Sequence, residues 1–224
     1  MTTFLLAFTA LFSIVNPLSS AFIFFSATQD FAPRVRAQVS RWVAIYAFSI
    51  VAASLYVGAY VLSFFGISLP VLKVAGGIVI AMSGWRMLSG PDTTEERRSE
   101  TASALPLSVT PSRLAFYPLT MPMTTGPGTI SVAISIGANR PTRLAAELDF
   151  VAETALAALV LALLVYFFYR HSERLARAMG PTGTTIVVRL TAFLLFCIGI
   201  QVLWNGAAQL LSSATIGVTG AAGS

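Results

Sequence analysis

The sequence predicts an all-α polytopic membrane protein, in which six transmembrane helices form two inverted three-helix repeats with broken helices 1 and 4. Of its 224 residues, 56% are hydrophobic and only 10% are charged, and the mean hydropathy is +0.79. A soluble domain of this size needs a more polar surface, so the composition predicts an integral membrane protein. Two proline-containing interruptions predict the broken helices, and a likeness between the two halves of the chain predicts the repeat.

Six apolar segments are long enough to cross a bilayer, which takes about 20 helical residues for a hydrocarbon core of about 30 Å. They are residues 2–28, 42–65, 69–88, 114–138, 150–169 and 185–211. The first segment has no Lys or Arg before it and is longer than the apolar region of a signal peptide, so we expect a retained helix. The six segments leave no room for a soluble domain.

Basic residues gather in the loops after the first, third and fifth segments. These loops and their flanks hold Arg34, Arg36, Arg41, Arg86, Arg97, Arg98, Arg113, Arg170, Arg174 and Arg177, whereas the opposite side has only Lys73, Arg140, Arg143 and Arg189. Because basic loops face the cytoplasm, we expect both termini on the outer, periplasmic side. Topology then accounts for the formal charge of +5, and nucleic-acid binding is not expected.

Two of the apolar segments are interrupted near their middle by proline and small polar residues. In hydrocarbon, the backbone groups that proline frees must find a polar partner. We therefore expect two broken helices that face each other and bind a small solute at the midplane. The candidate substrate-binding residues are Asn16, Pro17, Ser19, Ser20, Thr124, Thr125, Gly126, Pro127, Gly128 and Thr129. A simple proline kink is the alternative for the first interruption.

Two acidic residues open the fifth segment. Asp149 and Glu153 are four residues apart and so share one helix face. An acid inside a membrane segment is a candidate functional group, here for carrying a coupling proton. An ion pair of Glu153 with Arg143 or Arg189 is an equally good explanation.

Enzyme chemistry is not expected from this sequence. His171 is the only histidine and Cys197 the only cysteine, so the sequence predicts no metal site and no disulfide. The Asp149/Glu153 cluster lies on one helix, whereas an intramembrane aspartyl protease needs acids on two. No nucleotide-binding loop is present, and no cofactor is expected.

The second half of the chain repeats features of the first. Residues 72–90 align with residues 188–206, so that Lys73 matches Arg189, and Asn16-Pro17 aligns with Gly126-Pro127. Since each half has three segments, the second half enters the membrane from the opposite side. The predicted units are a first repeat (1–90), a cytoplasmic linker (91–112), a second repeat (113–211) and a flexible tail (212–224).

At Asn16-Pro17-Leu18-Ser19 and at Thr124-Thr125-Gly126-Pro127-Gly128-Thr129-Ile130-Ser131, the chain resembles the MarC family of bacterial and archaeal inner-membrane proteins. This family is also called the small neutral amino acid transporter family, and the likeness covers all six segments. It implies an inner-membrane location and transport of small neutral amino acids such as glycine or alanine, either coupled to a cation gradient or as export. Ser19 departs from the family, which commonly has glycine there.

The leading functional hypothesis is a secondary transporter that works by alternating access. A zwitterion would place its carboxylate on the amides after Pro17 or Pro127, and its ammonium group on oxygens of Asn16, Thr124 and Thr125. The expected partners are a small zwitterionic substrate, H⁺ or Na⁺ as coupling ion, the lipid bilayer and a second copy of the chain. A passive channel or a structural protein of the envelope is the alternative, because broken helices also line pores.

Overall fold

The computed structural model describes residues 2–90, 111–141 and 143–221, with side chains up to Ser213. Every regular element in these residues is a helix. The elements in chain order are α1 (Thr2–Val15), α2 (Pro17–Thr28), α3 (Pro33–Tyr56), α4 (Gly58–Phe64), α5 (Leu69–Ser89), α7 (Pro111–Leu114), the π-helical η1 (Ala115–Thr124), α8 (Pro127–Ala138), α9 (Leu144–Arg170) and α10 (Ser172–Ala221). The all-α prediction is thus confirmed for the described residues.

Five helical stretches in the described residues are long and apolar enough to cross a bilayer. They are Thr2–Thr28, Pro33–Tyr56, Leu69–Ser89, Leu144–Arg170 and Ser172–Ser213. The predicted fourth segment, 114–138, is divided mainly between η1 with 10 residues and α8 with 12. Each piece is shorter than the roughly 20 residues that cross the hydrocarbon core. The chain is therefore a multi-pass helical protein whose fourth segment is in two pieces.

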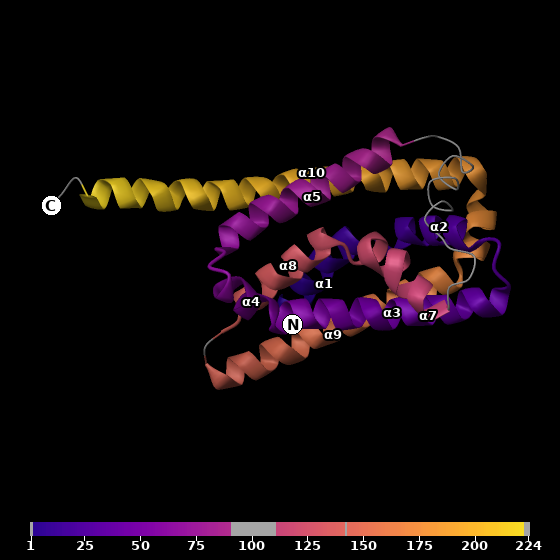
Figure 1. Cartoon of the computed structure of the whole chain (residues 1–224), viewed down its shortest axis with the longest axis horizontal. Coiled ribbons are helices and arrows are strands. Elements are labelled where there is room, and N and C mark those ends of the chain that lie inside the picture. Colours follow the sequence, from indigo (N-terminus) through magenta and orange to yellow (C-terminus); the bar gives the residue numbers. More distant parts are fainter. Residues whose placement is uncertain (1, 91–110, 142, 222–224) are drawn as a thin grey trace.

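The helices form a bundle, beside which α5 and α10 run next to each other (Figure 1). The core of the bundle lies between α1, α2, α3, η1 and α9, whose most buried apolar side chains include Leu11, Phe24, Val39, Leu119 and Tyr169. The α2–α3 and α9–α10 connections lie at one end of the bundle, and the α4–α5 and α8–α9 connections lie at the other (Figure 1). The connections at the two ends of α3 with α4 thus lie at opposite ends of the bundle, and so do those at the two ends of α9, as in a chain that crosses a membrane repeatedly.

Glycine allows α5 and α10 to touch backbone to backbone. A Cβ atom on Gly84 of α5 would lie 2.5 Å from the amide nitrogen of Phe196 in α10, and one on Gly77 would meet Leu203. On the other helix, Gly199 faces the backbone of Ala81. Small residues at such contacts let membrane helices approach closely. Because the hydrophobic effect does not drive helices together in lipid, the resulting van der Waals contacts stabilise the pair.

The helix boundaries differ from the prediction at the end of the chain. The sequence analysis began the sixth segment at residue 185, but α10 begins at Ser172 and bends at Gly180, which has φ 67° and ψ 177° and precedes Pro181. Basic residues are good helix formers, so the predicted loop between the fifth and sixth segments is largely helical. Within α10, only the bend at Gly180 separates this part from the predicted sixth segment. α10 also continues beyond residue 211 to Ala221, over most of the predicted tail.

The second segment begins earlier than predicted, and the linker cannot be compared. α3 begins at Pro33, not at residue 42, because proline is well suited to the first position of a helix. Val57 separates α3 from the short α4. Residues 91–110 of the predicted linker lie outside the described residues, and Pro111 opens α7.

Candidate functional site

The first break lies at Asn16, between α1 and α2. Asn16 has φ 44° and ψ 65°, in the left-handed region that asparagine tolerates better than most residues. Its Oδ1 accepts a hydrogen bond from the Ser19 amide at 3.4 Å, and Pro17 occupies the first helical position of α2, where no amide donor is needed. Ser20 Oγ donates to the freed carbonyl of Val15 at 2.9 Å. Side chains at this break therefore satisfy two of the backbone groups that it frees, the Ser19 amide and the Val15 carbonyl.

The second break is longer and lies at Thr125 and Gly126. Thr125 has φ −121° and ψ 73°, and Gly126 is extended with φ −78° and ψ 179°. Two residues before prolines, Tyr117 and Met121, also depart from helical geometry. Gly126 precedes α8 and has no side chain that could accept a hydrogen bond from the amides of the first turn. Unlike α2, α8 thus begins with amides that no capping side chain satisfies, an arrangement that suits an anionic group.

Tyr169 of α9 connects the segments around the two breaks. Its hydroxyl lies 2.7 Å from Thr124 Oγ1. Thr124 donates its only hydroxyl proton to the carbonyl of Leu119 at 2.7 Å, so Tyr169 is the donor to Thr124. The Tyr169 ring stacks on Phe24 of α2 with centroids 4.5 Å apart. Tyr169 therefore contacts η1 through its hydroxyl and α2 through its ring.

Tyr169 is not among the predicted site residues, although it ends the predicted fifth segment. The available signal was a phenol hydroxyl in an apolar segment, which needs a hydrogen-bond partner when buried. A tyrosine near the end of a membrane helix is also typical of the interface. Only the three-dimensional packing distinguishes a buried tyrosine from an interfacial one. Tyr169 is 1% exposed, so it is buried.

Most of the predicted site residues are buried. Ser19 and Thr125 are fully buried, and Thr124 and Thr129 are 2% and 3% exposed. Asn16 is partly buried and Pro127 is exposed. The Ser19 hydroxyl oxygen has no hydrogen-bond partner, although leaving such a group unsatisfied costs about 1–3 kcal/mol. The region around the breaks is thus closed in this conformation and holds one unsatisfied hydroxyl.

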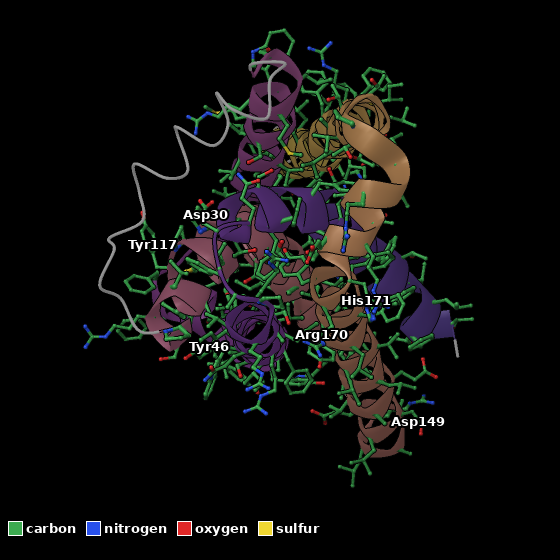
Figure 2. The ribbon with its side chains drawn as sticks, turned by 90° about the vertical axis from the view of Figure 1, so that its right-hand side faces the viewer. Asp30, Tyr46, Tyr117, Asp149, Arg170 and His171 are labelled. Atoms are coloured by element: carbon green, nitrogen blue, oxygen red, sulfur yellow. The ribbon has the colours of Figure 1, made fainter. Side chains whose placement is uncertain are left out.

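Other predicted residues face away from the hydroxyl cluster. Gly128 lies against Ile80 of α5, so its missing side chain makes room for a neighbouring helix. Glu153 Oε2 accepts a hydrogen bond from the amide of Phe4 at 2.9 Å, in the first turn of α1. Figure 2 shows Asp149 near one end of α9, far from Arg170 and His171 at the other.

The two predicted coupling acids lie well away from Tyr169 along α9. Sixteen residues separate Glu153 from Tyr169 (169 − 153), which corresponds to about 24 Å at the α-helical rise of 1.5 Å per residue. The structure thus connects Thr124 to Phe24 of α2 through Tyr169, and it does not bring the acids to them.

The comparisons with known proteins agree on one family. The sequence profile described as "MarC family integral membrane protein" matches residues 1–211. The chain is 30% identical over 210 residues to the inner membrane protein MarC of Escherichia coli O1:K1, covering 93% of this chain and 95% of that protein. It is 32% identical over 212 residues to the protein of the same name from Salmonella paratyphi A, with the same coverage.

The protein of that name from Citrobacter koseri is 31% identical over 214 residues, again covering 93% of this chain and 95% of the relative. No solved structure matches the chain. The family profile extends over both breaks and over all the helices described above except the end of α10. The chain therefore belongs to the MarC family of integral membrane proteins.

Proposed function

We propose that this protein is a secondary transporter of small neutral amino acids, such as glycine or alanine, that resides in a bacterial inner membrane. Under this proposal the solute binds between the two broken helices, and the site opens alternately to the two sides of the membrane. The inner-membrane location is supported by the names of the bacterial relatives. The choice of solute is what the resemblance to the MarC family implies, and the small residues at the breaks leave room for only a small side chain.

The observation that carries the proposal is the buried hydroxyl of Ser19. It lies three residues after Asn16, is 0% exposed and lacks a hydrogen-bond partner. A group that loses water on folding and gains no partner destabilises the protein unless a ligand uses it. A polar solute that enters the site supplies that partner, which favours a binding role over a simple proline kink.

The chemistry around the breaks suits a zwitterion. The amides that open α8 lack a side-chain cap and carry the positive end of the helix dipole, which favours a carboxylate. Hydroxyl and carbonyl oxygens near Thr124 and Thr125 suit an ammonium group. The Ser19 hydroxyl can donate to or accept from either group. The site would then bind both charges of an amino acid without a charged side chain.

The helix contacts support an inverted repeat as part of the proposal. Helix α1 packs on α9 as η1 packs on α3, and α8 packs on α3 as α2 packs on α9. Likewise α5 contacts α8 as α10 contacts α2. Each of these contacts thus has a counterpart when the halves 1–90 and 113–211 are exchanged, as a two-fold axis in the membrane plane requires, whereas the contact of α4 with α8 has none. Movement of one half against the other would then change which side is open.

Orientation and coupling are further parts of the proposal. The helix ends that flank the α2–α3 and α9–α10 connections are rich in arginine, which favours a cytoplasmic location for that end of the bundle, with both termini outside. These residues are Arg34, Arg36, Arg41, Arg170, Arg174 and Arg177. Asp149 and Glu153 are the candidates for H⁺ or Na⁺ coupling. Because they lie far from Tyr169 along α9, such coupling would act through movement of α1 or α9.

Uptake into proteoliposomes tests the proposed function. The full-length protein is reconstituted, and the initial rate of entry of labelled glycine and alanine is measured against concentration. Saturable uptake that unlabelled alanine inhibits is the expected result. Uptake that rises linearly to high concentration would favour the alternative, a passive channel, and no uptake beyond that of protein-free vesicles would contradict both.

A further inference from the structure

An open cavity of about 570 Å³ lies between α5, α8 and α10, apart from the hydroxyl cluster at Tyr169. Its polar lining comes from Lys73, Ser135, Asn139, Asn205 and Gln209, and its apolar lining includes Val132, Ile136 and Val202. The cavity lies toward the end of the bundle that holds the α4–α5 and α8–α9 connections, since Lys73 is near the start of α5 and Asn139 follows α8.

The cavity carries one positive charge. Lys73 is the only lysine of the chain, and its Nζ donates to Gln209 Oε1 at 3.1 Å. No acidic residue lines the cavity, and no ion pair joins Lys73 to a carboxylate within the described residues. An ammonium group has three donors, so Lys73 can still donate to an anionic solute.

A buried hydroxyl in the same lining lacks a partner. Ser135 Oγ makes no hydrogen bond among the described residues. Asn139 Nδ2 donates to the Ser135 carbonyl at 2.7 Å and Asn205 Oδ1 accepts from Gln201 at 3.0 Å, so both amides keep further hydrogen-bonding atoms. Because Ser135 Oγ is buried, its side chain must turn toward the cavity before the hydroxyl donates to a ligand beside Lys73.

A polar stripe joins this cavity to the second break. Ser131, Ser135 and Asn139 are spaced four residues apart on α8 and so lie on one face of that helix. Ser131 Oγ donates to the Leu72 carbonyl at 3.1 Å and lies where a Cβ of Gly76 would be. The stripe thus begins one turn after Pro127 and ends in the cavity, along the contact of α8 with α5.

We propose that this cavity binds the carboxylate of a small solute through Lys73 and Ser135, with the aliphatic part of the solute against Val132 and Ile136. The cavity is then an outer subsite from which the solute reaches the second break along the Ser131–Ser135–Asn139 face. Carboxylate binding needs only the cavity, whereas its place on a transport route rests on the proposed function.

Chemical labelling of Lys73 tests the subsite directly, because Lys73 and the amino terminus are the only amines in the chain. The full-length protein is acetylated with and without solute, and mass spectrometry of the peptides follows Lys73. At about ten times its dissociation constant, propionate or L-alanine should slow acetylation about tenfold, since only the unbound fraction reacts. Glycinamide, which has no carboxylate, should give no protection.

Variants separate the charge from the fold. Because a hydrogen bond to a charged group contributes about 1.5–3 kcal/mol, Lys73→Gln should weaken binding of L-alanine at least about tenfold by titration calorimetry. Lys73→Arg should retain binding, and so should Arg143→Gln, which removes an exposed cation outside the cavity. A folded Lys73→Gln protein with unchanged affinity would overturn the subsite.

Two further arms distinguish the ligand source and the transport claim. Protection of Lys73 by inorganic phosphate or by phosphatidylglycerol vesicles, but not by carboxylates, would assign the cavity to a phosphate group and overturn the proposal. Protection by carboxylates without saturable uptake would contradict the proposed transporter function and support the subsite. Saturable uptake that is unchanged in Lys73→Gln, with no protection of Lys73, would support the transporter function and contradict the subsite.

Discussion

The two breaks interrupt their helices at matching positions but by different means. At the first, the single residue Asn16 adopts a left-handed conformation, and its side chain caps α2. At the second, Thr125 and Gly126 form an extended connection, and α8 begins without a side-chain cap. The first break therefore satisfies itself, while the second keeps backbone donors for another group. We conclude that the second break contributes most of the backbone polarity of the candidate site.

The positive φ that usually favours glycine occurs at the asparagine of the first break and not at the glycine of the second. Gly126 has φ −78°, which any residue can adopt, whereas Asn16 has the positive φ that usually favours glycine. Gly126 is needed for space, because a Cβ would lie 2.8 Å from the carbonyl oxygen of Pro122. Strain thus lies at the first break and close packing at the second.

The largest expected effect tests the packing of the second half-helix. Near the end of α8, a Cβ on Gly137 would overlap the carbonyl oxygen of Leu55 in α3. The change Gly137→Val should lower the free energy of unfolding in detergent by about 3 kcal/mol, since overpacking forces backbone movement. The neighbouring Ala138 is exposed, so Ala138→Val should change stability by less than about 0.5 kcal/mol. Equal stability of the two variants would contradict the close α3–α8 contact.

The next largest effect tests the strain at the first break. Asn16→Ala should cost about 1–2 kcal/mol of unfolding free energy, because alanine neither caps α2 nor tolerates a positive φ. Asn16→Gly should cost less than Asn16→Ala, because glycine adopts this conformation freely. Melting curves of the two variants compare them. If Asn16→Gly were the less stable of the two, the left-handed conformation at this residue would be wrong.

A smaller effect tests the link between the two breaks. Tyr169→Phe removes the hydrogen bond to Thr124 and keeps the ring stacked on Phe24, so we expect a loss of about 1 kcal/mol. Tyr166→Phe, on the same helix and without a side-chain hydrogen bond among the described contacts, is the matched control. Chemical denaturation of the two variants measures the difference. A loss no larger than in the control would remove Tyr169 as the connection.

The smallest effect on stability has the opposite sign. Because the Ser19 hydroxyl is buried without a partner, Ser19→Ala should leave stability unchanged or raise it by up to about 1 kcal/mol. Ser20→Ala should instead lower stability by about 1 kcal/mol, since it removes the bond to the Val15 carbonyl. Thermal melting without solute distinguishes the pair. A clearly destabilised Ser19→Ala would mean that this hydroxyl already serves the fold.

Local features of the sequence predicted the elements well. Apolar runs predicted the membrane helices, and proline with asparagine or glycine predicted both breaks, because these signals depend on backbone chemistry within a few residues. The contacts that close the candidate site join distant segments, and the sequence did not predict them. Tyr169 meets Thr124 across 45 residues and Glu153 meets Phe4 across 149, and no local pattern marks either pair.

Arg36 shows the same limit for charge. In the sequence it counts as one basic residue of a cytoplasmic loop, which predicts topology alone. In the structure it is 7% exposed. It donates to the Thr28 carbonyl at the end of α2, and it pairs with Glu173 of α10 at 2.6 Å. A charge sum over the loops cannot distinguish a solvated arginine from one that joins α2, α3 and α10.

The most direct measurement is a double-mutant cycle on the equilibrium binding of L-alanine to the purified protein, with Ser19→Ala, Thr125→Ala and the double variant. If one solute bridges the two breaks, each single change weakens binding, and the losses couple by about 1 kcal/mol or more. Folded variants that bind alanine as tightly as the unaltered protein would show that the polar groups at the two interruptions hold no common ligand.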